Sequence, residues 1–122
     1  MPGPESPPGR VGSDAGGFRL SNSAKEFRVE AWGYWTPEVI SAFRRLSPVA
    51  ARKLSALGAF VFDAKELKPQ GIDGQEALRE LFRMMAALPF TRGSVFAENA
   101  LARMQLTRLV RDAGLAERVS VE

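Results

Sequence analysis

Two hydrophobic periods alternate along this short chain, and that alternation constrains the fold more than any other feature. Apolar side chains first recur at every second residue, as in a strand with one buried face, and later at helical spacing. Helices that separate strands imply parallel neighbours joined by crossover connections. Because 122 residues allow one hydrophobic core, the pattern predicts a single α/β domain.

Two strand-like runs open the folded part of the chain. Residues 18–20 and 26–35 are joined by a segment whose Ser and Asn are typical of turns. In the second run Phe27, Val29 and Ala31 occupy alternate positions. This period of two predicts a β-hairpin with one buried face.

The first helical pattern begins with a capping signal. Thr36 can cap the helix, and Pro37 stands at the first helical position, where its missing N–H is not needed. The apolar stripe continues to Gly58, with a kink or a second helix start expected at Ser47-Pro48.

The central strand is expected at residues 59–64. This short apolar run closes on Asp63 and indicates a strand buried on both faces, followed by an exit loop over residues 65–73. Asp73 and Glu76 have the spacing of a capping box and predict the start of the second helix.

A third helix and two further strands complete the pattern. Asn99 is expected to cap the last helix, and Gly114 to end it. Strands are expected at residues 90–98 and 119–121. The predicted order is β-β-α-β-α-β-α-β, which forms a single mixed β-sheet packed by helices.

Residues 1–17 differ from the rest of the chain in composition. They are rich in Pro and Gly and poor in large apolar side chains, so we expect a flexible tail followed by the α/β domain at residues 18–122. The segment has no cationic start followed by an apolar run, and no stretch of the chain is long and apolar enough for a membrane span. We therefore expect a soluble, cytoplasmic protein.

The chain contains no Cys and no His. This excludes disulfides, thiolate or imidazole metal sites, cysteine nucleophiles and the usual neutral-pH general base. We expect no cofactor and no enzymatic activity; a carboxylate enzyme using Asp63 and Asp73 is the weaker alternative.

The chain has a net charge of +3, and its positive and negative residues alternate along the sequence without forming blocks. We therefore expect no nucleic-acid partner. Arg103, Arg108 and Arg111 are interpreted as a solvated helix face in preference to an anion site.

Three motifs, taken in order, resemble a known family. These are the strand FVFDA ending at Asp63, the pair Ile72-Asp73 before the next helix, and the closing pattern RLVRDAGLAERVSV. Together with the element order they resemble the STAS-like domain, the anti-sigma-factor antagonist fold. The resemblance covers residues 17–122 and implies a regulatory protein-binding module with a protein partner and a possible homodimer.

The resemblance also implies a difference in regulation. Phosphorylated family members carry a Ser or Thr directly after the Asp that starts this helix, and Gly74 stands there in this chain. We therefore expect the phospho-switch to be missing.

Two groups of residues are candidates for partner or ligand binding. The first surrounds the carboxyl end of the central strand, where open α/β sheets bind ligands; the second is an aromatic cluster that can anchor an interface. The candidates are Asp63, Lys65, Gln70, Asp73, Gly74, Gln75, Trp32 and Tyr34.

Plainer structural roles compete with binding for several of these residues. A capping role alone would explain Asp73, and core packing is expected for Trp35. A small-molecule or lipid-binding domain of the same fold is the rival function, because the aromatic cluster at residues 32–35 could line a pocket.

Overall fold

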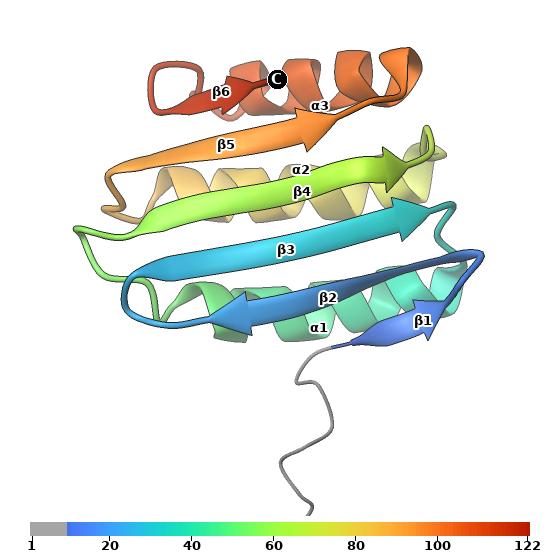
Figure 1. The fold of residues 1–122 in the computed structure, drawn as a ribbon, viewed down its shortest axis with the longest axis horizontal. Helices are drawn as coiled ribbons and strands as arrows, with labels where there is room; N and C mark the ends of the chain where they lie inside the picture. Colours follow the sequence, from blue (N-terminus) through green and yellow to red (C-terminus); the bar gives the residue numbers. More distant parts are fainter. Residues whose placement is uncertain (1–9) are drawn as a thin grey trace, which may run out of the picture.

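The sheet has six strands and is packed by three helices in a computed structural model that describes residues 10–122 (Figure 1). The elements in chain order are β1 (Val11–Ser13), β2 (Gly16–Asn22), β3 (Glu26–Gly33), α1 (Pro37–Ala51), β4 (Ala59–Leu67), α2 (Ile72–Ala86), β5 (Arg92–Ala97), α3 (Ala100–Asp112) and β6 (Val119–Val121).

Strand order in the sheet follows the chain order, from β1 at one edge to β6 at the other. The pairs β1–β2 and β2–β3 are antiparallel, and β3 to β6 are parallel. This confirms the prediction of a single mixed sheet, with one more strand than expected. None of the described helices is both long and apolar enough to cross a membrane.

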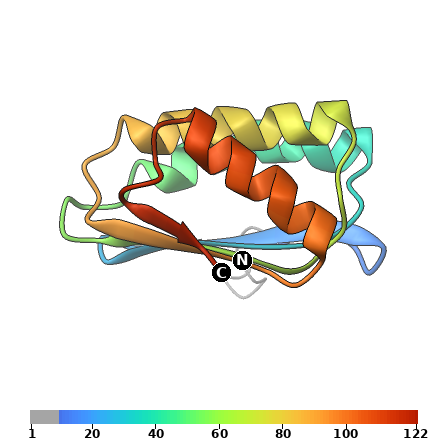
Figure 2. The ribbon, with the colours of Figure 1, turned by 90° about the horizontal axis from the view of Figure 1, so that it is seen from above.

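All three helices lie on one face of the sheet (Figure 2). The parallel strands are added one after another in the same direction, and right-handed crossovers of that kind place every connecting helix on the same side. Among residues 10–122 no helix lies over the opposite face, which is called the open face below.

The helix-covered face contains the hydrophobic core. Phe60 and Phe62 of β4 are fully buried, and the Phe62 ring lies 5.6 Å from that of Phe82 on α2. Trp35 is buried beside Phe43 of α1, which confirms its expected place in the core.

The prediction that the central strand is buried on both faces was wrong. In β4 the side chains of Phe60, Phe62 and Ala64 are buried, whereas Val61 and Asp63 are half-buried. The alternation follows from the helix layer, which covers only one side of the strand.

The strand also continues beyond Asp63. Glu66 pairs with Trp32 of β3, and Leu67 pairs with Gly33 after a register shift. Charged side chains can extend a strand where they point to solvent. Asp63 therefore lies within β4, and the loop expected at residues 65–73 begins later.

The N-terminal boundary differs from the expected one. Residues 11–13 and 16–17 are paired in the sheet, so the predicted flexible tail does not extend to residue 17. Glycines permit this pairing, because a Cβ on Gly17 would collide with the backbone oxygen of Val11. The part of the predicted tail at residues 1–9 lies outside the described residues.

Two predictions about the helices also need correction. Helix α1 is one helix with Pro48 inside its last turns and ends at Ala51, so no second helix reaches Gly58. Pro48 and Ala77 of α2 line the same small cavity, and the packing of α1 on α2 offsets the hydrogen bond that Pro48 cannot make.

Helix α2 is not capped by Asp73. Its N-cap is Gly71, with no side-chain cap, and Asp73 lies inside the first turn. Thr36 and Asn99 do cap α1 and α3, as expected.

Candidate functional site

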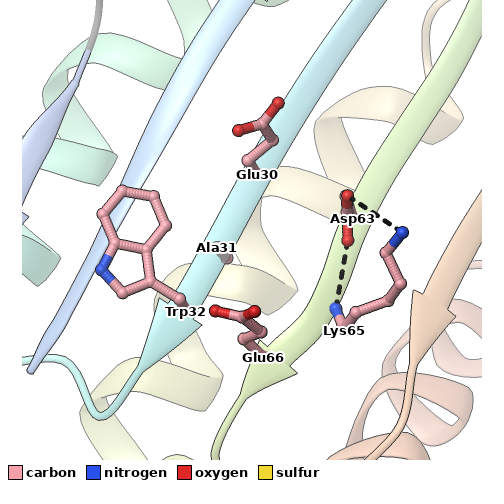
Figure 3. A pocket seen from close by; sticks show the side chains of 6 residues that line it. All are labelled: Glu30, Ala31, Trp32, Asp63, Lys65 and Glu66. Atoms are coloured by element: carbon pink, nitrogen blue, oxygen red, sulfur yellow. Dashed lines mark hydrogen bonds and ion pairs between the residues drawn. The ribbon is translucent and has the colours of Figure 1, made fainter. Parts of the chain in front are cut away.

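A hollow of about 310 Å³ lies on the open face between β3 and β4 (Figure 3). Three of the predicted site residues, Trp32, Asp63 and Lys65, line it. They meet because the side chains of neighbouring parallel strands stand on the same face of the sheet. The full lining is Glu30, Ala31, Trp32, Asp63, Lys65 and Glu66.

Asp63 is held by cations on both sides. Its carboxylate lies 3.7 Å from the Arg28 guanidinium and 3.8 Å from the Lys65 ammonium, and it also accepts a hydrogen bond of 3.2 Å from the Lys65 backbone N–H. Glu30 lies 3.6 Å from the same Arg28 and 4.0 Å from Arg19. These ion pairs form a network across β2, β3 and β4 in which cations and anions alternate.

Trp32 lies over the glycine-rich hairpin of β1 and β2. Its indole N–H donates a 2.7 Å hydrogen bond to the backbone oxygen of Ser13, and a Cβ on Gly17 would come within 3.0 Å of the ring. The Arg10 guanidinium lies 4.7 Å from the ring centre. The Trp32 ring thus makes a cation–π contact with an arginine of its own chain.

Gln70 has a structural position in the fold, and its predicted role in binding a partner stays a prediction. Its side chain is only 4% exposed. The amide oxygen accepts from the Trp35 N–H at 3.1 Å, and the amide nitrogen donates to the backbone oxygens of Gly33 and Lys68 at 3.0 and 2.8 Å. One side chain therefore joins the end of β3 to the loop before α2.

Gly74 and Gln75 support this arrangement, Gly74 as a buried residue and Gln75 as a half-buried one. Gly74 is buried, and a Cβ there would lie 3.0 Å from Gln70. Gln75 donates a 2.9 Å hydrogen bond to the Gln70 backbone oxygen. The Gln70 side chain lies in the space beside Gly74, and the expected approach of a partner backbone there stays a prediction.

Tyr34 and Asp73 are exposed at the carboxyl end of the sheet, and so is Ile72, which was not among the predicted site residues. Tyr34 is 54% exposed and Ile72 is 84% exposed. The Tyr34 hydroxyl lies 2.9 Å from the place where a Cβ on Gly71 would stand, so the ring reaches the start of α2. Tyr34, Ile72 and Asp73 are called the docking edge below.

The exposure of Ile72 could have been predicted from the spacing of apolar residues in the sequence. Ile72 precedes the apolar stripe of α2 and is out of phase with its buried members, among them Leu78, Leu81 and Met85. An apolar residue at a helix start that no core position requires is a candidate for an interface. Glu30 and Glu66 were missed because their place in the hollow depends on how far β4 extends.

Asp63 lines the hollow and Asp73 does not, so the two carboxylates of the enzyme alternative do not flank a common hollow. Within residues 10–122 there is no group of three or more His, Cys, Asp or Glu side chains suited to hold a metal ion.

No protein-family model, no curated protein and no solved structure matches this chain. The fold and its two surfaces define a two-layer α/β protein with one open sheet face. The STAS-like assignment stays a prediction from the sequence.

Proposed function

We propose that this protein is a non-enzymatic, regulatory protein-binding module whose partner contacts the docking edge of Tyr34, Ile72 and Asp73. The proposal depends on the exposure of two large apolar side chains, Tyr34 and Ile72, and on the reach of the Tyr34 hydroxyl to Gly71, the residue before Ile72. Exposed apolar side chains gathered at one place, with a charge at the rim, are typical of protein interfaces.

The edge is also rigidly supported, which favours binding without a large ordering cost. Gln70 ties the segment before α2 to Gly33 and to Trp35, which flank Tyr34 in the chain. A second anchor comes from Gln105 of α3, whose side chain bonds to both the N–H and the C=O of Gln70 at 2.9 and 3.1 Å.

The resemblance to STAS-like domains agrees with this proposal, because it implies a partner-binding role near the start of the same helix. Gly74 argues for regulation without the family's phospho-switch, since the position carries no hydroxyl. The partner is then controlled by its availability or by another modification.

Affinity capture with a tagged protein tests the proposal. Ile72→Asp and Asp73→Arg should each remove a partner that the unaltered protein retains, because both change the docking edge without touching the core. Leu57→Asp is the matched control: Leu57 is 91% exposed and precedes β4, at the opposite end of the strand. Equal retention by all variants, or equal loss with Leu57→Asp, would refute the docking edge.

A small-molecule binding domain is the second candidate, and the hollow beside Trp32 is the observation that favours it. Native mass spectrometry separates the two. A co-purifying small molecule that is lost in Trp32→Ala but kept in Ile72→Asp supports the ligand reading. A ligand-free protein that still captures a partner through Ile72 supports the binding module.

A further inference from the structure

Helix α3 has a second surface that its packing does not require. The residues that pack it on the sheet are Ala102, Leu106, Leu109 and Val110, all of them buried. Leu101 and Met104 lie on the opposite side and are 61% and 60% exposed. Helical geometry places Arg108 and Arg111 along the same outward stripe, since residues three and four apart share a face.

The outward stripe of Leu101, Met104, Arg108 and Arg111 is apolar in its first half and cationic in its second. A shallow hollow of about 310 Å³ follows it, lined by Arg103, Met104, Thr107, Arg108 and Arg111. No carboxylate is among these lining residues. Only Arg111 is paired with an acid, the exposed Asp112 at 3.4 Å, and within the described residues Arg108 makes no ion pair.

The position of α3 leaves this stripe free. Helix α3 is the last of the three helices and lies over β5 and β6 at one side of the molecule, with α2 beside it (Figures 1 and 2). The stripe spans about 15 Å, because a helix rises about 1.5 Å per residue. A short peptide segment matches that length.

We infer that the outward stripe of α3 binds an acidic segment of a protein partner, with one or two apolar side chains on Leu101 and Met104 and carboxylates on Arg108 and Arg111. Charge complementarity carries the choice of occupant. Arg guanidinium groups bind carboxylates with two parallel hydrogen bonds. The adjoining apolar side chains add binding free energy when a partner removes them from water. This surface is separate from the docking edge, and its test does not depend on the proposed function.

The test measures fluorescence anisotropy of a labelled short peptide that carries two leucines followed by glutamates. The unaltered protein should bind it at low salt and release it at high salt, because screening weakens exposed charge pairs. Arg108→Glu together with Arg111→Glu should weaken binding by about tenfold or more. Met104→Ser should weaken it by about threefold while the charge is unchanged.

The control keeps the change in net charge the same. Arg45→Glu together with Arg52→Glu reverses two exposed arginines on and after α1, and should alter binding by less than about twofold. Equal weakening by the two double variants would overturn the inference, since net charge alone would then explain binding. Binding of the glutamine version of the peptide would also overturn it. So would binding of phosphatidylserine vesicles or single-stranded DNA in place of the acidic peptide.

Discussion

Gln70 is the residue on which the geometry of the carboxyl end of the sheet depends. Its buried amide makes three hydrogen bonds to backbone groups on both sides of Tyr34 and at Lys68. A buried polar group is stabilising only while its partners are present. Of the three partners, the Gly33 backbone oxygen also accepts a 3.1 Å hydrogen bond from the Lys68 N–H. The docking edge is therefore shaped by a buried side chain.

Gln70→Leu should lower the free energy of unfolding by about 2–4 kcal/mol, because the Trp35 backbone N–H and the backbone oxygens of Gly33 and Lys68 each lose a hydrogen bond from this side chain. Urea denaturation measures the change. Gln75→Leu removes one peripheral hydrogen bond and should cost less than about 1 kcal/mol. Similar losses in the free energy of unfolding for the two variants would show that Gln70 does not hold the end of β3 to the loop before α2.

Gly74→Ser should destabilise the protein by about 1 kcal/mol, although serine is the better helix former. The new Cβ would press on Gln70, whose side chain is held at both ends of its amide and cannot withdraw easily. Thermal unfolding measures the loss. Asp73→Ser changes the adjacent exposed residue and should leave the melting temperature nearly unchanged; a higher melting temperature for Gly74→Ser would contradict the packing argument.

At the scale of elements, the hairpin of β1 and β2 shows how glycines determine where an aromatic side chain can lie. Gly17 has no side chain on the open face, and Trp32 uses that space to reach the Ser13 carbonyl. The pairing of β1 with β2 and the position of the Trp32 indole therefore depend on each other. The same packing holds Trp32 beside the hollow, and so links the N-terminal strands to the candidate ligand site.

Gly17→Val should detach β1 and cost about 1–3 kcal/mol, because its side chain would meet both the Val11 carbonyl and the Trp32 ring. Hydrogen exchange read by NMR gives the most direct measurement. The Trp32 indole proton should exchange slowly in the unaltered protein and rapidly in the variant. Ser21→Val, farther along β2 at an exposed position, should leave that exchange rate unchanged. Continued protection in Gly17→Val would disprove the coupling.

Elements were predicted well where local chemistry decides them and poorly where the tertiary environment does. Thr36 and Asn99 cap their helices by contacts within three residues, so the sequence contains what is needed. The length of β4 depends on pairing with β3, and charged residues such as Lys65 and Glu66 conceal it. Gly71 caps α2 without any side-chain signal.

At the scale of the whole molecule, the division between a covered and an open sheet face determines where binding can occur. The order of the strands places every helix on one side, and the core lies between. The sequence pattern predicts the sheet and its helices but not this asymmetry, because period-two alternation in β4 is masked by the half-buried Val61. The open face then brings Trp32, Asp63 and Lys65 together, while Gln70 and Gly74 turn inward.

Phe62→Ala should lower the free energy of unfolding by about 3–5 kcal/mol, because it leaves a cavity between β4 and α2. Val61→Ala, the adjacent residue on the open face, should cost less than about 1.5 kcal/mol since water can reach the site. Chemical denaturation of both variants tests the division between the faces. Equal losses would mean that both faces of β4 are buried.

The proposed function requires that a protein partner is recognised at the docking edge. Its most direct test is a photo-reactive amino acid placed at position 72 and, in a second protein, at position 57, followed by irradiation in the cells that make the protein. We predict a discrete cross-linked partner from position 72 and none from position 57. The same adduct from both positions, or none from position 72, would contradict the claim.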